Sequence, residues 1–124
     1  MDENDLSEAI IGCAMQVHTA LGPGLLESAY EQCLYYELSK RFNVRKQVPL
    51  TFVYKQVELD CSYQLDLIVE DKVIIEVKSV ESLEPIHSTE LLTYLKLSNC
   101  KLGLLLNFNV VHLQEGIKRI ANDF

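Results

Sequence analysis

Residues 65–78 read LDLIVEDKVIIEVK, and this stretch decides the fold. Two runs rich in Val, Ile and Leu flank the polar pair Glu70-Asp71, which is the pattern of two buried strands joined by a tight turn. Three charged residues, Asp66, Glu76 and Lys78, interrupt these apolar runs. Because side chains alternate along a strand, we expect Glu76 and Lys78 on the same face of a β-hairpin.

The length of the hairpin loop determines whether Asp66 joins that face. If the loop spans Glu70 to Lys72, Asp66 lies directly across from Glu76. A two-residue loop shifts the register by one residue and turns Asp66 to the other face. The sequence is compatible with both loops.

The first register would bring two carboxylates beside one ammonium group. Two hard oxygen ligands suit Mg²⁺ or Mn²⁺, and Lys78 could orient or help to deprotonate an attacking water and offset charge on a phosphorane-like transition state. Burying these groups without a metal or a partner would be costly. The alternative is a Glu-Lys pair on a solvent-facing strand, with Asp66 in an ordinary salt bridge. Because so short a spacing also arises by chance, the spacing alone does not decide between them.

Helical periodicity and turn residues place further elements around the hairpin. The expected elements are helices over residues 5–20 and 25–41, strands over 44–54, 57–69 and 72–80, a helix over 85–99 and a strand over 102–108. The last fifteen or so residues allow either a short strand or a helical turn. The order α-α-β-β-β-α-β predicts one α/β domain over residues 1–124, with a mixed sheet of four or five strands flanked by helices.

The composition is that of an ordinary globular protein, with 48% hydrophobic and 23% charged residues among 124. The apolar runs are far shorter than the ~20 residues that cross a bilayer, and the acidic N-terminus does not resemble a secretory signal. The cysteines lie too far apart to suggest a zinc site or a disulfide scaffold. We therefore expect a cytoplasmic protein whose thiols are reduced and mostly buried. They are Cys13, Cys33, Cys61 and Cys100.

The net charge of −7 argues against a protein that coats nucleic acid through a broad basic surface. It does not exclude a nuclease, because carboxylates that hold a divalent metal add negative charge where the metal supplies positive charge. The charge is therefore compatible with an enzyme that acts on nucleic acid at a metal site.

The spacing of Asp66, Glu76 and Lys78 on neighbouring strands resembles the PD-(D/E)XK nuclease superfamily. Gly24, Glu27 and Tyr30 resemble the motif that names the GxxExxY protein family, a small branch of that superfamily. Further matches follow in order along nearly the whole chain. They are Val17-His18, Gln47-Val48-Pro49-Leu50, Asp66, Glu76-Val77-Lys78, Tyr94-Leu95-Lys96 and Leu106-Asn107-Phe108. The resemblance implies a restriction-endonuclease-like fold.

The resemblance also implies roles for particular residues. Asp66 and Glu76 would be metal ligands together with the Val77 carbonyl, and Lys78 would be the catalytic lysine. Glu27 would correspond to the extra acidic residue that many members place beside the metal. Its alternative is a glutamate in the first turn of a helix, where the helix dipole favours it.

Tyr30 lies one turn on from Glu27, so it could hydrogen-bond the site or belong to the core. On the third helix, His87, Glu90 and Tyr94 lie on one face and could contact the residues that hold the metal. The family pattern usually has glutamine at the middle position, and the carboxylate of Glu90 could add a metal contact or repel phosphate. Leu65 stands where the superfamily name has proline.

These observations predict a nuclease that depends on Mg²⁺ or Mn²⁺ and hydrolyses phosphodiester bonds, with DNA favoured over RNA. The alternative is a non-catalytic module with the nuclease fold that binds a protein or a nucleic acid. A second alternative is that the charged triplet is structural and the protein only oligomerises. We also expect a homodimer or a targeting partner protein, and no membrane association.

Overall fold

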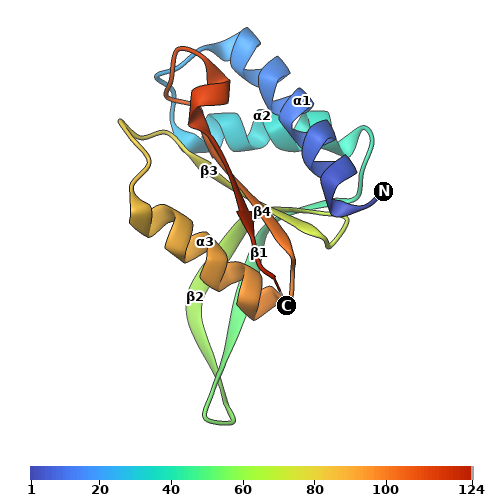
Figure 1. Cartoon of the computed structure of the whole chain (residues 1–124), viewed down its shortest axis with the longest axis vertical. Coiled ribbons are helices and arrows are strands. Elements are labelled where there is room, and N and C mark those ends of the chain that lie inside the picture. Colours follow the sequence, from blue (N-terminus) through green and yellow to red (C-terminus); the bar gives the residue numbers. More distant parts are fainter. Residues whose placement is uncertain (124) are drawn as a thin grey trace.

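Five strands form one sheet in the spatial order β1-β2-β3-β4-β5, and helices lie on both of its faces (Figure 1). The computed structural model describes residues 1–123, apart from the side chains of residues 61 and 62. The elements are α1 (Glu3–Leu21), α2 (Glu27–Ser39), β1 (Val44–Tyr54), β2 (Val57–Val69), β3 (Val73–Lys78), α3 (Pro85–Ser98), β4 (Leu102–Asn107), the 3₁₀ helix η1 (Leu113–Gly116) and β5 (Ile117–Ala121). The predicted element order is confirmed, and the C-terminal segment contains both a helical turn and a short strand.

The sheet is mixed. β1, β2 and β3 pair antiparallel, β3 pairs parallel with β4, and β4 pairs antiparallel with β5. The parallel pair needs a crossover connection, and α3 supplies it. In the strand order, β3 and β4 both lie inside the sheet rather than at an edge. This position explains why both strands are apolar along most of their length.

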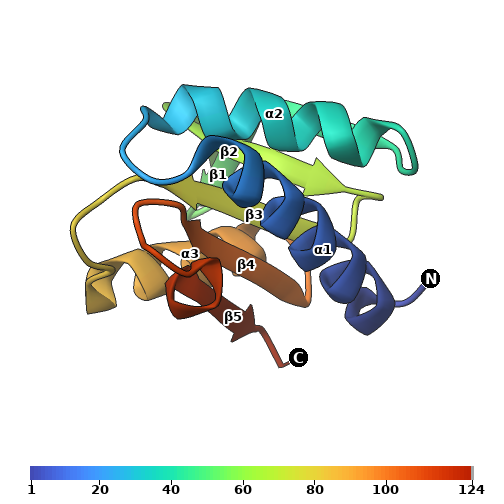
Figure 2. The same cartoon turned by 90° about the horizontal axis from the view of Figure 1, so that it is seen from above.

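Two apolar clusters hold the layers together. α1 and α2 pack on one face of the sheet and α3 packs on the other, as Figure 2 shows. In β3, Ile75 and Val77 belong to the cluster under α1 and α2, whereas Ile74 belongs to the cluster under α3. This alternation places Glu76 and Lys78 on the face that α3 covers.

A tight turn joins β2 to β3 and sets their register. Glu70 and Asp71 both have a φ of 53°, and the Lys72 N–H donates to the Val69 carbonyl over 2.9 Å. The strands then pair Val69 with Val73, so three residues lie in the loop. The register is therefore the one in which Asp66 faces Glu76.

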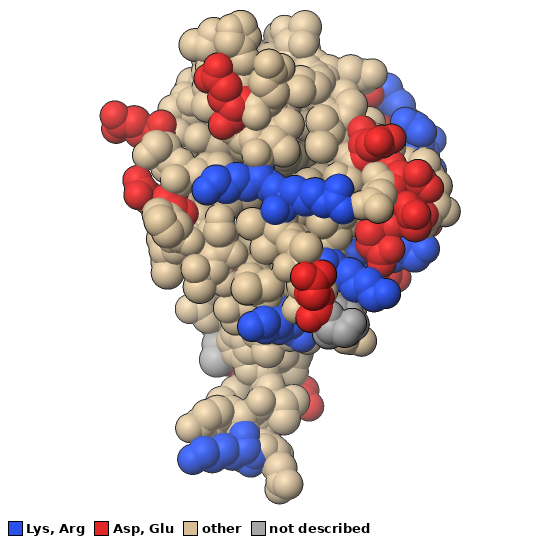
Figure 3. Space-filling view, in the orientation of Figure 1, with Lys and Arg blue, Asp and Glu red and all other residues tan. Residues whose placement is uncertain are grey.

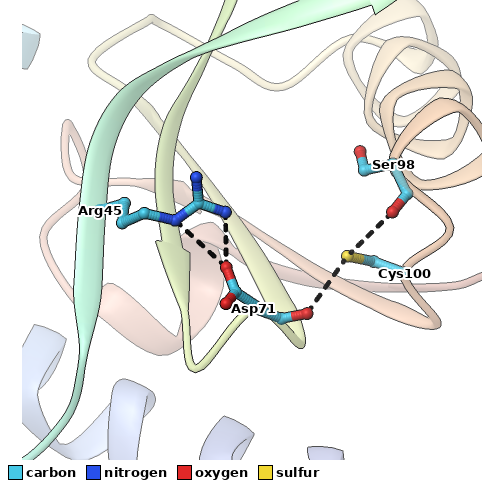
Figure 4. Close-up of polar contacts among 4 residues, drawn as sticks. All are labelled: Arg45, Asp71, Ser98 and Cys100. Atoms are coloured by element: carbon cyan, nitrogen blue, oxygen red, sulfur yellow. Dashed lines mark hydrogen bonds and ion pairs between the residues drawn. The ribbon is translucent and has the colours of Figure 1, made fainter.

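Polar contacts fix this turn to its neighbours (Figure 4). Arg45 of β1 forms an ion pair of 2.5 Å with the Asp71 carboxylate. The Cys100 thiol, just after α3, lies 3.9 Å from the Asp71 carbonyl and 3.8 Å from the Ser98 carbonyl. The turn is thereby tied to strands and helices that are distant in sequence.

The cysteines carry no disulfide among the described side chains. Cys13 and Cys100 are buried, and Cys33 is half-buried. The prediction for Cys61 lies outside the described side chains. Among residues 1–123, no helix is both long and apolar enough to cross a membrane.

Candidate active site

The candidate site begins where the backbone ladder between β2 and β3 ends. The last pair is Leu67 with Ile75, and Asp66 and Glu76 follow it. The Asp66 N–H donates to Oε2 of Glu76 over 2.9 Å, and the Val77 N–H donates to Oδ2 of Asp66 over 2.8 Å. Each carboxylate thus bonds the backbone of the opposite strand, and the two converge across the hairpin.

Burial dominates the electrostatics of these carboxylates. Glu76 is only 7% exposed, and burial, followed by the charge of Asp66, raises its pKa to about 8. Burial also raises the pKa of Asp66, while the Val77 N–H and then the charge of Lys78 lower it. The half-buried Asp66 and the buried Glu76, with one nearby ammonium, therefore hold protons more tightly than usual, and extra positive charge would favour their ionised form.

Lys78 lies next to this pair on the α3 face. Its charge lowers the pKa of both Asp66 and Glu76. Among the described residues it forms no ion pair within 4.0 Å.

Glu27 comes to the site from the first turn of α2. Its Oε2 accepts the Ser79 N–H over 3.1 Å, just beyond the end of β3. The Ser79 hydroxyl donates to the Leu25 carbonyl over 2.6 Å, so the loop before α2 is also tied to β3. The charge of Glu27 raises the pKa of Asp66. The sequence-predicted acidic residue on α2 thus lies within electrostatic range of the pair.

Tyr30 has a structural position. It is fully buried and stacks on Phe108 with ring centroids 4.6 Å apart. Its hydroxyl donates to the Gly22 carbonyl over 2.6 Å and accepts the Leu25 N–H over 3.1 Å. Tyr30 therefore anchors the loop that leads to Glu27, and its hydroxyl bonds backbone atoms of that loop.

Sequence reasoning missed two site residues, Glu31 and Gln47. Burial raises the pKa of Glu31, and the charge of Asp66 and a side-chain hydrogen bond with it raise the pKa further. The Gln47 amide donates to Oε1 of Glu31 over 2.8 Å, and its hydrogen bond with Asp66 lowers the pKa of that carboxyl. Gln47 therefore links a helix carboxylate to Asp66.

The backbone explains how Gln47 reaches both groups. β1 pairs Lys46 with Leu67 and Val48 with Leu65, but Gln47 and Asp66 between them do not pair. Gln47 has a φ of 50°, a left-handed conformation that costs roughly 1 kcal/mol or more for a residue other than glycine. Such conformations concentrate at functional sites. Two signals were present in the sequence: Glu31 lies four residues after Glu27, on the same helix face, and Gln47 opens one of the segments that resemble the GxxExxY family.

The predicted face of α3 divides into two parts. The His87 ring accepts the Glu84 N–H through Nδ1 over 2.9 Å, so His87 caps the start of α3. Glu90 and Tyr94 instead line a pocket of about 280 Å³. Burial raises the pKa of Tyr94, followed by the charges of Glu90 and Glu76. Of the three, Tyr94 has the clearest electrostatic connection to the carboxylates.

The oxygen donors of the site fit a divalent metal in their chemistry but form no three-residue cluster among the described residues. Among the described residues no group of three His, Cys, Asp or Glu side chains is arranged to hold a metal ion. Asp66 and Glu76 nevertheless offer hard oxygen atoms beside the Val77 carbonyl, which are the donors that Mg²⁺ and Mn²⁺ prefer. Their raised pKa values also fit a place where a cation would relieve repulsion. The chemistry of the donors fits, while one oxygen of each carboxylate accepts a backbone N–H of the opposite strand.

Comparison with known families identifies the superfamily of the chain. The sequence profile of the PD-(D/E)XK nuclease superfamily matches residues 4–120, and the chain belongs to that superfamily. The fold class predicted from the resemblance is thereby confirmed. The narrower GxxExxY assignment stays a prediction that rests on Gly24, Glu27 and Tyr30. Comparisons with curated proteins and with solved structures find no match.

Proposed function

We propose that this protein is a metal-dependent nuclease that hydrolyses phosphodiester bonds of nucleic acid, within one domain over residues 1–124. The observation that carries the proposal is the convergence of two carboxylates, the half-buried Asp66 and the buried Glu76, across the β2–β3 hairpin beside Lys78. Membership of the nuclease superfamily supports the same chemistry.

The metal, Mg²⁺ or Mn²⁺, would be held by Asp66, Glu76 and the Val77 carbonyl, with Glu27 as a further carboxylate. When bound, it would supply Lewis-acid activation of water and neutralise charge on the phosphate. Lys78 would orient the attacking water and stabilise negative charge that develops on the phosphoryl oxygens. Gln47 and Glu31 would keep Asp66 in position, because outer hydrogen bonds orient metal-ligating carboxylates.

The acidic character of the chain limits how nucleic acid would bind. The net charge is −7, and acidic side chains lie on both sides of the face in Figure 3, most densely on the right, while a short band of Lys and Arg crosses its middle. Phosphate contacts from so few cations give weak binding. We propose DNA ahead of RNA as the substrate, with a homodimer or a targeting partner protein supplying additional contacts.

The second candidate is a non-catalytic binding module with the nuclease fold. Two observations favour it: the acidic balance, and the absence of a three-residue metal cluster among the described residues. Such a module would bind nucleic acid or a protein without cleaving it.

Cleavage assays distinguish the two candidates. Labelled single- and double-stranded DNA and RNA would be incubated with Mg²⁺ or Mn²⁺ and with wild type, Lys78→Ala or Lys118→Ala. Lys118 is an exposed lysine on the edge strand β5, so its variant is a matched control. We expect cleavage of DNA by wild type and the control, and a loss of about a hundredfold or more with Lys78→Ala. Nucleic-acid binding without cleavage by wild type would favour the module.

A further inference from the structure

Three aromatic side chains from three elements border one pocket on the α3 side of the sheet. Phe52 of β1 and Tyr63 of β2 lie edge to face with ring centroids 5.7 Å apart, and Tyr94 of α3 follows at 6.3 Å from Tyr63. The pocket has a volume of about 280 Å³, and its polar groups come from Thr89, Thr93 and Glu90. The lining thus combines flat rings with a few hydrogen-bonding groups.

Core packing alone does not account for this cluster. Phe52 and Tyr94 are half-buried, but Tyr63 is 49% exposed. The β1–β2 hairpin that carries Phe52 and Tyr63 extends away from the body of the protein (Figure 1), and most of its visible surface is uncharged (Figure 3). An aromatic ring in this position can accept a planar ligand on its face.

The pocket lies on the same sheet face as the candidate active site, and Tyr94 is the residue that relates the two. Tyr94 lines the pocket, and its pKa is raised by the charges of Glu76 and Asp66 as well as by that of Glu90. Glu76 and Lys78 lie on the sheet face that α3 covers, the same side as the pocket. If a phosphate of a nucleic-acid strand lay at the carboxylates, the adjacent nucleotide would therefore extend toward the aromatic rings.

We propose that the pocket of Phe52, Tyr63 and Tyr94 binds an unpaired nucleobase next to the phosphodiester that is cleaved. This inference rests on the proposed nuclease function and specifies its substrate as single-stranded nucleic acid. A base in a duplex is stacked and cannot reach such a pocket without leaving the helix. Stacking of bases on aromatic rings is a common way to bind single strands.

Glu90 gives the pocket a preference among bases. A carboxylate accepts hydrogen bonds and donates none, so it pairs with the amino group of cytosine and meets only a carbonyl at that position of thymine. This explains how a carboxylate, which would repel phosphate, is compatible with nucleic acid at this place. We expect cytosine to bind more tightly than thymine.

Fluorescence anisotropy tests the proposal with labelled oligo-dC, oligo-dT and duplex DNA of about ten nucleotides, a length that such sites can hold. Ca²⁺, which takes similar oxygen ligands, would replace Mg²⁺. We expect Tyr63→Ala to weaken single-strand binding about tenfold or more, and Tyr63→Phe to retain it because the ring remains. Tyr54→Ala is the matched control, since Tyr54 is 61% exposed on the same hairpin and does not line the pocket. Glu90→Gln should reduce the preference for dC over dT.

Some outcomes would contradict the base-binding proposal and leave the nuclease proposal intact. If wild type cleaves nucleic acid but Tyr63→Ala binds oligo-dC as well as wild type does, the nuclease proposal stands and the base pocket falls. Equal losses for single strands and duplex would also overturn it, because the ring would then only brace the hairpin against α3. If wild type neither binds nor cleaves any nucleic acid, the proposed function itself fails. Urea unfolding of each variant checks that the hairpin still folds.

Discussion

The two ends of the β2–β3 hairpin are held together by different interactions. Toward the turn, residues 67–69 pair with residues 73–75 through a regular backbone ladder, and their side chains are buried and apolar. Toward the site, the ladder stops and two carboxylates accept the backbone N–H groups instead. The same two strands thus provide stability at one end and reactive groups at the other.

This difference shows that the site lowers the folding stability of the hairpin. Side chains such as Ile75 gain free energy when they leave water, whereas a buried carboxylate loses hydration and keeps its proton unless a cation compensates. The pKa of Glu76, raised to about 8 by burial and then by the charge of Asp66, reflects that penalty. The turn end should therefore respond to side-chain volume, and the site end to pH and to metal ions.

Truncation at the turn end should have the largest effect on stability. Ile75→Ala removes a fully buried side chain in the middle of the sheet, and we expect a loss of about 3 kcal/mol of unfolding free energy. Ile75→Val should cost roughly 1 kcal/mol. Urea unfolding at pH 5 and pH 8.5 checks both. The loss should be similar at the two pH values, and a strong pH dependence would contradict the contrast between the two ends.

Removing the charge of Glu76 should raise the free energy of unfolding, whereas truncation at the turn end lowers it. The pKa of Glu76 rises from 4.5 to about 8 on folding, so its contribution to stability is fully present below pH 4.5 and is lost as pH rises through about 8. Glu76→Gln cannot ionise, and we expect it to be more stable than metal-free wild type by roughly 2 kcal/mol at pH 8.5. The gain should vanish near pH 4. A variant that is less stable than wild type at pH 8.5 would refute the penalty.

The hydrogen bonds around Asp66 should affect metal affinity more than stability. Glu31→Gln keeps the size of the side chain but removes the charge that interacts with Asp66 and Gln47. We expect Mn²⁺ affinity to fall about tenfold, as is typical when an outer partner of a metal ligand is changed. Glu37→Gln on the same helix is the matched control, because Glu37 pairs with Lys40. Unchanged affinity in calorimetry would remove Glu31 from the site.

The smallest effect concerns the loop before α2. Tyr30→Phe keeps the ring that stacks on Phe108 but removes the hydroxyl that bonds Gly22 and Leu25. We expect a loss of about 1–2 kcal/mol in urea unfolding. Tyr36→Phe should change little, since Tyr36 is exposed on the same helix. If the two variants were equally stable, the hydroxyl of Tyr30 would not anchor the loop.

Much of the fold could be predicted because the decisive signals are local. Strand alternation placed Glu76 and Lys78 on one face, and the turn at Glu70-Asp71 marked the hairpin. The loop length could not be predicted, because it depends on left-handed conformations that Glu70 and Asp71, as non-glycine residues, seldom adopt.

The outer part of the site could not be predicted because it depends on contacts between distant segments. Gln47 reaches Glu31 and Asp66 only through a left-handed backbone in the middle of a strand, which no sequence pattern indicated. His87, Glu90 and Tyr94 all lie on α3, but helical periodicity could not show that His87 would cap the helix while Tyr94 would lie beside Tyr63.

Calorimetric titration of Mn²⁺ into wild type and Glu76→Ala at pH 8.5 and pH 6 tests the metal centre most directly. We predict that wild type binds the ion at both pH values, more tightly at pH 8.5, because Glu76 with a pKa of about 8 must release its proton. Proton release should make the measured heat depend on the ionisation enthalpy of the buffer at pH 6. Glu76→Ala should not bind. The absence of binding by wild type at millimolar Mn²⁺ would mean that Asp66 and Glu76 are structural carboxylates, and would contradict the nuclease site.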